Sequence, residues 1–361
     1  MEIGSEFHIE ISNLLDNIDN REIPKFGFDS HYLYLLSGRT AIDIICRDIL
    51  ASRRVQNVYM PSYCCSSMIM PFIENGINVL FYDVRYIDGG VYFDIDTTAS
   101  FDLLYITNYF GFDSFPDLTR IEKLKEQGSI IIYDRTHSLY KDIDPVLQLA
   151  DYAFASIRKW VAITSGAIVW KRSQNFDLKN LRDCPYTENK LRAQILKSSY
   201  LKGDKNVKKN DFYTIFGSFD DSLKNDYVGY KIDPVSMRIL RETDFERIKE
   251  QRRQNALIYY NELSGCNGIR FLFDSFSSDE TPLFVPIIVD EPLVRLGLRQ
   301  ELIQNQIYCP IHWSKHEWIG PESKSNELYD KELSLVCDQR YNVDDMGRVI
   351  KVVKNYLNNK L

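Results

Sequence analysis

From about residue 35 to residue 170, short runs of β-branched and aromatic residues alternate with segments that repeat apolar residues at helical spacing. Short apolar runs predict buried strands, and apolar residues three and four positions apart predict amphipathic helices, for example over 40–54 and 66–76. The predicted strands are NVYMP (57–61), NVLFYDV (78–84), FDLLYITN (101–108), SIIIYD (129–134), DYAFAS (151–156) and GAIVWK (166–171). Because strands that alternate with helices form βαβ units, the sequence predicts an α/β fold whose mostly parallel sheet is covered by helices on both faces.

The pattern changes after residue 171. Residues 172–228 are polar and rich in Lys, Asn and Asp, which predicts a solvated surface insertion, with a cover over a substrate as the alternative. One long helix is predicted over 233–265, and the rest of the chain is predicted as strand, helix, strand and helix. Since 361 residues exceed what one hydrophobic core usually serves, we expect a large domain over 1–232 and a linker helix with a smaller α/β domain over 233–361.

Composition and charge narrow the class of protein. With 44% hydrophobic residues the chain is expected to fold, and a net charge of -7 argues against nucleic acid as a partner. No stretch approaches the ~20 apolar residues of a membrane-spanning helix, and the first residues do not form a signal peptide. We therefore expect a soluble cytoplasmic protein without a membrane partner.

The cysteines and histidines do not predict a metal site. The seven cysteines are scattered without zinc-site spacing, so we expect free thiols in a reducing compartment. His312 and His316 stand at helical spacing, but they lack a nearby acidic third ligand.

One candidate anion site is the stretch Ser37-Gly38-Arg39-Thr40-Ala41 at the start of a predicted helix. Glycine at position 38 allows close approach to the backbone, and the free amides and the helix dipole favour an anion. Arg39 and Thr40 could add donors for a phosphate. The alternative is that the Ser-Gly pair only caps the helix.

Three further candidates stand at the ends of predicted strands, where an open α/β sheet places its functional groups. Asp134 ends SIIIYD and could hold a cationic ligand nitrogen, or it could only cap the next turn. Lys159 follows DYAFAS, and an amine among apolar and cationic neighbours can attack a carbonyl to form a Schiff base, although most lysines are only surface charges. Asn108 ends a third strand, directly before Tyr109-Phe110-Gly111.

The order of these candidates along the chain suits one cofactor. Pyridoxal 5'-phosphate (PLP) needs a phosphate cradle, an acid that keeps its pyridine nitrogen protonated, and a Schiff-base lysine. The helix start at Gly38, then Asp134, then Lys159 would supply these three functions in turn. The combination therefore predicts a PLP site.

Seven stretches of the sequence also match, in order, the motifs of a known family. They are SGRTAIDIIC, VYMPSYCCSSMIMPFIENGINVLFYDV, ITNYFGF, IIYDRTHSL, FASIRKWVAITSGAIVW, YKIDPVSMRIL and LSLVCDQRYNVDDMGRVI. Over nearly its whole length the chain thus resembles the DegT/DnrJ/EryC1/StrS family, the fold-type I PLP enzymes that are mainly sugar aminotransferases. The resemblance implies a fold-type I PLP-dependent transferase with a large sheet domain and a smaller C-terminal domain.

The resemblance also implies roles for single residues. Lys159 matches the Schiff-base lysine, Asp134 matches the partner of the pyridine nitrogen, and His137 stands near the ring hydroxyl of the cofactor. Ser156 matches a phosphate ligand, as does the start at Gly38, Arg39 and Thr40.

Two parts of the motif pattern differ from the family. Cys65 stands where many members carry the aromatic residue that stacks on the cofactor, and Tyr63 lies two residues earlier. Arg39 replaces a hydroxyl residue of the phosphate motif. Asn108 matches the strand end before the family's turn glycine, and both Cys65 and Tyr63 remain candidates for contact with the cofactor.

The implied activity is transfer of an amino group from an amino acid, expected to be glutamate, to a keto-sugar. The sugar is expected to be nucleotide-linked, the enzyme a homodimer, and the product destined for surface polysaccharide or related biosynthesis. One alternative is a PLP-dependent sugar dehydratase, whose members carry histidine where this chain has Lys159. The other is a catalytically inactive PLP-fold protein with a binding or regulatory role.

Overall fold

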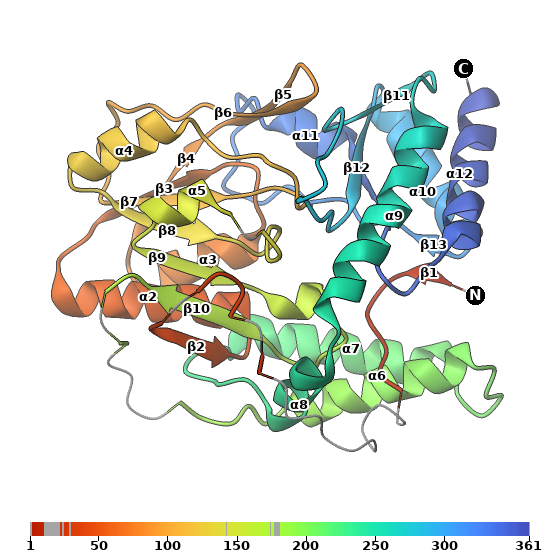
Figure 1. Ribbon diagram of the computed structural model, residues 1–361, viewed down its shortest axis with the longest axis horizontal. Coiled ribbons are helices and arrows are strands. Elements are labelled where there is room, and N and C mark those ends of the chain that lie inside the picture. The colour runs from red at the N-terminus through yellow and green to blue at the C-terminus, as the bar shows by residue number, and fades with distance from the viewer. Residues whose placement is uncertain are drawn as a thin grey trace.

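A seven-stranded sheet forms the centre of the larger part of the molecule in the computed structural model (Figure 1). The structure describes residues 2–10, 22–23, 25–28, 30–141, 143–173, 175–176 and 181–360. The strand order is β2-β10-β9-β8-β7-β3-β4. In that order the strands comprise Tyr32–Leu35, Ala167–Lys171, Tyr152–Ala155, Ile130–Asp134, Leu103–Thr107, Asn57–Pro61 and Asn78–Tyr82.

The sheet is mostly parallel. Strands β9, β8, β7, β3 and β4 run parallel to one another, whereas β10 is antiparallel to both of its neighbours. The register pairs Thr107 with Asp134 and Asp134 with Phe154, so the carboxyl ends of β7, β8 and β9 lie level at one edge. Ligands of open parallel sheets bind outside this edge.

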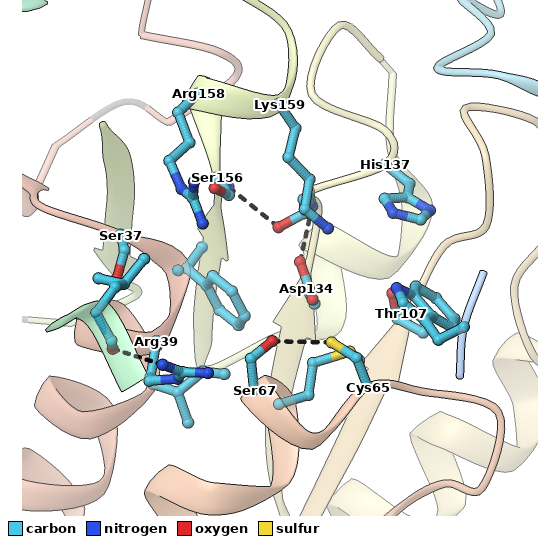
Figure 2. A pocket seen from close by; sticks show the side chains of 17 residues that line it. Ser37, Arg39, Cys65, Ser67, Thr107, Asp134, His137, Ser156, Arg158 and Lys159 are labelled. Atoms are coloured by element: carbon cyan, nitrogen blue, oxygen red, sulfur yellow. Dashed lines mark hydrogen bonds between the residues drawn. The ribbon is translucent and has the colours of Figure 1, made fainter. Parts of the chain in front are cut away.

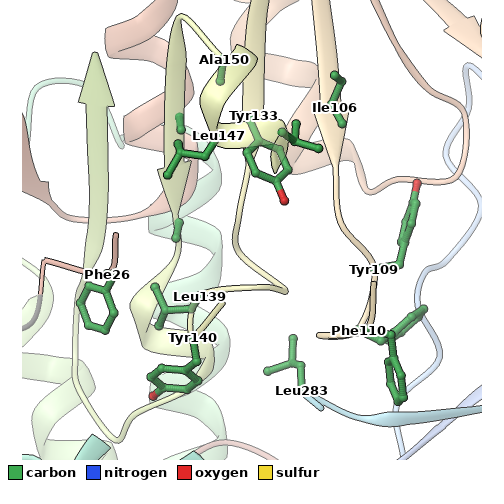
Figure 3. Packing of buried hydrophobic residues seen from close by; sticks show 14 of the residues in the cluster. Phe26, Ile106, Tyr109, Phe110, Tyr133, Leu139, Tyr140, Leu147, Ala150 and Leu283 are labelled. Atoms are coloured by element: carbon green, nitrogen blue, oxygen red, sulfur yellow. The ribbon is translucent and has the colours of Figure 1, made fainter. Parts of the chain in front are cut away.

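Helices cover both faces of the sheet, because successive strand residues point to opposite sides. Leu103 and Tyr105 of β7 pack in one apolar cluster with helices α2 and α3. Leu104 and Ile106 of the same strand pack in another cluster with α4 and α5 (Figure 3). These helices are α2 (Gly38–Ser52), α3 (Ser66–Glu74), α4 (Leu118–Glu126) and α5 (Pro145–Leu149).

The C-terminal part is built on a second, antiparallel sheet of order β11-β12-β14, seen opposite the large sheet in Figure 1. Its core is a separate apolar cluster to which α9, α10 and α12 contribute. The elements are α9 (Phe245–Leu263), β11 (Ile269–Phe271), β12 (Val285–Val289), α10 (Pro292–Gln304), α11 (Asn326–Lys331), β14 (Glu332–Leu335) and α12 (Val343–Asn358). The N-terminal strand β1 (Ile3–Gly4) pairs with β13 (Ile307–Tyr308), which places the start of the chain against this part.

The segment predicted as a polar insertion contains two helices, α6 (Thr187–Leu201) and α7 (Lys209–Asn225). Phe212 and Phe216 of α7 pack against Ala193 of α6, so the pair has a small apolar core of its own. A hairpin of β5 (Val84–Ile87) and β6 (Gly90–Phe93) stands apart from the large sheet.

The single long helix predicted over 233–265 is wrong, because the segment forms two helices. Helix α8 (Pro234–Glu242) ends at Thr243, whose backbone is extended. Helix α9 (Phe245–Leu263) begins after Asp244, whose side chain accepts the Arg247 N–H at 3.0 Å. An acidic N-cap inside the periodic pattern therefore starts a new helix.

The predicted α/β fold with a mostly parallel, doubly covered sheet is confirmed. The six predicted strands are present, with 78–84 divided between β4 and β5, whereas β1, β2, β6, β11 and β14 were not predicted. The predicted strand over 307–313 shrinks to the two residues of β13. Among the described residues, no helix is long and apolar enough to cross a bilayer.

Candidate active site

A cleft opens at the carboxyl edge of the large sheet, beside the ends of β7, β8 and β9 (Figure 2). The space within it, counted out to open solvent, is about 580 Å³. The predicted site residues that line it are Gly38, Arg39, Cys65, Asp134, His137, Ser156 and Lys159. Residues up to 121 positions apart, from Gly38 to Lys159, thus meet in one place.

The start of helix α2 forms one end of the cleft. The Ser37 hydroxyl accepts the Thr40 N–H at 3.2 Å, and the Thr40 hydroxyl donates to the Tyr227 carbonyl at 2.9 Å. Ser37 and Thr40 therefore hold the helix start in place. The amides of Gly38 and Arg39 precede the first intrahelical hydrogen bond, so they can donate to an anion in the cleft.

Two arginines, Arg39 and Arg158, face the same end of the cleft (Figure 2). Arg39 Nη1 donates to the Leu223 carbonyl at 2.5 Å, and burial lowers the pKa of Arg39, although a guanidinium stays charged. The buried Nε of each arginine has no hydrogen-bond partner among the described residues. Because a buried N–H without an acceptor is costly, this end of the cleft is suited to an anionic ligand with several oxygens.

Asp134 lies at the centre of the cleft floor and is 5% exposed. Its Oδ1 accepts the Thr136 N–H at 2.8 Å, and its Oδ2 accepts the Tyr105 hydroxyl at 2.8 Å. Burial raises the pKa of Asp134, while these hydrogen bonds and the charge of Lys159 oppose the rise. A buried carboxylate of this kind is stabilised by a cationic group placed directly against it.

Lys159 lies across the cleft from Asp134. It stands on the single turn η1 (Ile157–Lys159), which follows β9. The turn is anchored by Trp160, whose buried indole N–H donates to the Thr136 carbonyl at 2.7 Å. The Ser156 N–H donates to the Thr136 hydroxyl at 3.0 Å. The ends of β8 and β9 are thereby tied together, and the Lys159 amine points toward Asp134 (Figure 2).

His137 closes a third side of the cleft. Its Nδ1 accepts the Phe110 N–H at 3.1 Å, so the proton of the neutral ring is on Nε2. Burial, followed by the charges of Lys159 and His312, lowers the pKa of His137 well below its usual range. The ring stacks on Trp313 with centroids 5.7 Å apart. His137 is therefore a neutral hydrogen-bond donor at pH 7.

Three predicted site residues do not line the cleft. Thr40 is hydrogen-bonded to the Tyr227 carbonyl instead of facing the cleft. Tyr63 is buried in an aromatic cluster against Tyr109 and Tyr329. Asn108 is fully buried, and its side-chain oxygen accepts the Ser114 hydroxyl at 3.3 Å. Cys65 does line the cleft, with Sγ 2.8 Å from the Ser67 hydroxyl oxygen.

Trp313 lines the cleft but had no signal in the sequence. It follows β13, some 150 residues after the motifs that supply the rest of the cleft, and only the packing of the C-terminal part against His137 brings it there. Thr107 and Ser67 also line the cleft, next to predicted site residues.

A second, larger cavity of about 1,130 Å³ meets the cleft at Arg158 and Lys159. Its other walls come from the N-terminal segment over residues 4–7, from α7 and from the C-terminal part. The guanidinium of Arg340 donates to the backbone carbonyls of Ser5 and Glu6 at 3.2 Å, which holds the N-terminal segment against the cavity. Lys159 therefore stands between two spaces, a cleft on the sheet and a cavity built from distant segments.

The described residues contain no group of three or more His, Cys, Asp or Glu that could hold a metal ion. His312 and His316 have different surroundings. His312 lines the larger cavity, whereas His316 Nε2 lies 3.0 Å from the Ser62 carbonyl oxygen.

Comparison with solved structures identifies the fold. The chain is similar to the putative sugar aminotransferase Spr1654 from Streptococcus pneumoniae in its PLP form, with a TM-score of 0.65 and 14% identity over 100% of both chains. It is similar to the aminotransferase TlmJ from Streptoalloteichus hindustanus, with a TM-score of 0.62 and 16% identity over 91% of this chain and 86% of that one. NtdA from Bacillus subtilis, with bound cofactor PMP, has a TM-score of 0.63 and 15% identity over 92% of this chain and 74% of that one.

No protein-family model and no curated protein sequence matches the chain. At identities this low, structural similarity establishes a common architecture and leaves the chemistry to be argued from the site. The chain has the fold of these three proteins.

Proposed function

We propose that the protein is a PLP-dependent aminotransferase that moves an amino group from an amino acid to a keto-sugar. One observation carries the proposal. Lys159, Asp134 and the start of α2 face a single cleft, at the carboxyl edge of the sheet, in a fold shared with a putative sugar aminotransferase. The fold alone would not support an activity, but this arrangement of amine, carboxylate and anion-binding end does.

The residues of the cleft fit PLP. The unpaired Nε atoms of Arg39 and Arg158, with the amides at the start of α2, supply donors for its phosphate. Asp134 would hold its protonated pyridine nitrogen, and Lys159 would bind its carbonyl carbon. When bound, PLP supplies an electron sink for the α-carbon of an amino acid.

Each of the three reacting side chains has a distinct task. Lys159 would hold the cofactor until the amino acid arrives. Its freed amine would then take a proton from the substrate α-carbon as base and, as acid, deliver it to the carbon that Lys159 had held. Asp134 keeps the neighbouring nitrogen cationic through its own negative charge. His137 donates a hydrogen bond from Nε2 without taking up charge.

The larger cavity beyond Lys159 supports a bulky acceptor. It has about twice the empty volume of the cleft, about 1,130 Å³ against about 580 Å³. Its walls combine Arg158 with the aromatic rings of Phe284 and Tyr308, which suits a sugar linked to a nucleotide.

We extend the proposal to glutamate as the donor and to a cytoplasmic homodimer that acts in surface polysaccharide or related biosynthesis. All seven cysteines are free, which supports a reducing compartment. Glutamate and the homodimer rest on the sequence resemblance.

The proposal is tested by the visible absorption spectrum of the purified protein with PLP, before and after addition of glutamate. We expect a band of lysine-bound PLP that glutamate converts to the pyridoxamine form. Lys159→Ala should lose the band, whereas Lys205→Ala, at an exposed lysine in a turn, should keep it.

The other outcomes separate the alternatives. A band that no common amino acid converts would contradict the aminotransferase and favour the dehydratase or a binding protein. The absence of any band in the wild-type protein would contradict PLP as the cofactor.

A further inference from the structure

A chain of hydrogen bonds links three side chains next to the larger cavity. Ser334 and Glu332, both on β14, are hydrogen-bonded through the Ser334 hydroxyl and Glu332 Oε1. The Ser334 hydroxyl oxygen also lies 2.8 Å from Nδ1 of His312. Glu332 Oε2 accepts the backbone N–H of His312 at 2.7 Å, so both carboxylate oxygens are engaged. Glu332 and Ser334 are buried.

His312 is the outer member of this series of hydrogen bonds, and it lines the same cavity as Lys159. Its ring is surrounded by the aromatic side chains of Phe110, Phe284 and Trp313, with centroids 4.9–5.5 Å away. Among the described residues, the hydrogen bonds of His312 are formed by its backbone N–H and by Nδ1. The ring orientation is therefore fixed through Nδ1, and Nε2 is left for a molecule in the cavity.

We propose that Glu332, Ser334 and His312 form a proton relay whose outer end, Nε2 of His312, exchanges a proton with the carbonyl oxygen of the substrate bound beside Lys159. This inference rests on the proposed aminotransferase for its chemistry, but the relay itself does not require it.

The relay has two states, and the same pairs of side chains are hydrogen-bonded in both. With Glu332 protonated on Oε1, Glu332 donates to Ser334, Ser334 donates to Nδ1 of His312, and the ring carries its proton on Nε2. With Glu332 ionised, each hydrogen bond reverses, so the ring carries its proton on Nδ1 and Nε2 offers a lone pair. The imidazole stays neutral in both states, and only its tautomer changes.

This exchange suits amination of a ketone, in which a C–N bond forms and the C–O bond breaks with release of water. His312 Nε2–H gives a proton to the departing oxygen, while Nδ1 takes one from Ser334 and Ser334 takes one from Glu332. The relay returns to its first state when Nε2 recovers a proton from the nitrogen of the new bond. Two such cycles move both protons from this nitrogen to the carbonyl oxygen, which then leaves as water. No proton is gained or lost by the protein overall.

The electrostatic surroundings permit both states near neutral pH. Burial raises the pKa of Glu332 to about 8, opposed by the charge of Arg295 on α10. Tyr63 and Cys309 also face this carboxyl group. Burial, with the charge of Lys159, lowers the pKa of His312 to about 3, and His137 is the other titratable ring beside it, with centroids 5.9 Å apart.

The relay is tested without any reaction by nitrogen NMR of the full-length protein labelled with ¹⁵N-histidine, because the shifts of the two ring nitrogens report the tautomer. The signal of His312 among the five histidines is assigned by its loss in His312→Asn. We expect a tautomer change with a midpoint near pH 8 in the wild type, and none in Glu332→Gln or Ser334→Ala. A tautomer that stays constant from pH 6 to pH 9.5, or that still changes in Glu332→Gln, would overturn the relay.

The role in amination is tested with 2-oxoglutarate and enzyme loaded with pyridoxamine phosphate. Asn in His312→Asn can keep the bond to Ser334 but has no group that moves a proton, so we expect the rate of conversion to fall by about 10²-fold or more with PLP affinity unchanged. His316→Gln, which lies outside the cavity, is the matched control. An unchanged rate in His312→Asn would overturn the role in amination.

The two tests separate the relay from the proposed function. If the wild-type protein shows the tautomer change but neither glutamate nor 2-oxoglutarate reacts, the relay stands and the aminotransferase assignment fails. If both substrates react but the tautomer never changes, the aminotransferase stands and the relay fails.

Discussion

The two spaces on either side of Lys159 differ in how the sequence builds them. The cleft is assembled from strand ends and the starts of helices α2 and α3 within residues 37–159, with Leu223 and Trp313 as additions from later in the chain. The larger cavity draws on residues 4–7, on α7 and on segments after residue 250. The cleft has a polar end with unpaired donors, whereas most charged groups of the cavity already have partners within the protein.

This difference separates a site organised by local structure from one organised by long-range packing. A strand end and the turn after it are set by the sheet register, so the residues of the cleft depend on few distant contacts. The wall of the cavity depends in part on hydrogen bonds between segments that are hundreds of residues apart, such as those from Arg340 to the carbonyls of Ser5 and Glu6. Changes in the cavity wall should therefore affect stability, and changes in the cleft should affect cofactor chemistry.

The largest effect is expected from Arg340→Gln in the cavity wall. Arg340 donates to buried Asp338 at 2.8 Å. Burial raises the pKa of the Asp338 carboxyl, but the charges of Arg340 and Arg252 and the hydrogen bonds from Arg340 together hold this pKa below its usual range. Removal of one partner from a buried pair typically costs about 3–5 kcal/mol. We expect a loss of that size in urea unfolding at pH 7, which shrinks toward acid pH as Asp338 takes up a proton.

Lys354→Gln is the matched control for this variant. Lys354 lies on the neighbouring helix and pairs with Glu262 at 2.9 Å, but both side chains are exposed. Exposed pairs contribute about 0–1 kcal/mol. Equal losses in the two variants would contradict the view that the cavity wall depends on a buried ion pair.

The second effect is expected from Asp134→Asn in the cleft. The amide cannot keep the ring nitrogen of the cofactor charged, and loss of one preorganised electrostatic partner usually lowers kcat by about 10²–10³-fold. Unfolding by urea should change little, because the Asn side chain keeps an oxygen that can accept the Thr136 N–H. Turnover is measured with glutamate and 2-oxoglutarate as the exchanging pair. Wild-type turnover in this variant would show that another acid partners the cofactor.

The third effect is expected from Arg39→Gln at the anion-binding end. A hydrogen bond to a charged group contributes about 1.5–3 kcal/mol, which corresponds to a roughly 10- to 100-fold rise in the Kd for PLP. Arg182→Gln, at a residue outside both spaces, is the control. Fluorescence titration with PLP measures both, and an unchanged Kd in Arg39→Gln would place the phosphate elsewhere.

The last effect concerns the pH dependence of stability in Glu332→Gln. The pKa of Glu332 is raised to about 8 by burial, so the folded state keeps a proton that the unfolded chain loses near pH 4.3. The stability from this group is thus fully present below pH 4.3 and is lost as the pH rises toward 8. The difference in unfolding free energy between wild type and variant should change with pH by at most about 1.4 kcal/mol per unit. Parallel stability curves from pH 5 to pH 8.5 would contradict the buried, protonated carboxyl.

The same comparison explains what the sequence could predict. Asp134, Ser156 and Lys159 follow apolar strands directly, so their position at the sheet edge could be predicted from local pattern. Trp313 and His312 follow a strand of only two residues and reach the site through tertiary packing, which leaves no periodic signal. The break in the long helix at Asp244 was missed because one polar residue does not interrupt helical spacing.

Tyr63 shows that the position of a residue in a motif does not predict whether its side chain faces the ligand. The motif makes Tyr63 a candidate for contact with the cofactor. In the structure, however, Tyr63 follows the end of β3 and packs against Tyr329 of the C-terminal part, with ring centroids 5.0 Å apart. Cys65, two residues later, faces the cleft. Which of two nearby residues faces a ligand depends on backbone direction in the turn, which pattern alone does not specify.

The central claim is that Lys159, in this cleft, takes part in transfer of an amino group. The most direct measurement is a single turnover: PLP-loaded protein is mixed with excess glutamate and no acceptor, and 2-oxoglutarate is counted per protein chain. Our account predicts one molecule of 2-oxoglutarate per chain for the wild type and none for Lys159→Ala. Release in Lys159→Ala equal to that in the wild type, or no release from a wild-type protein that holds PLP, would contradict it.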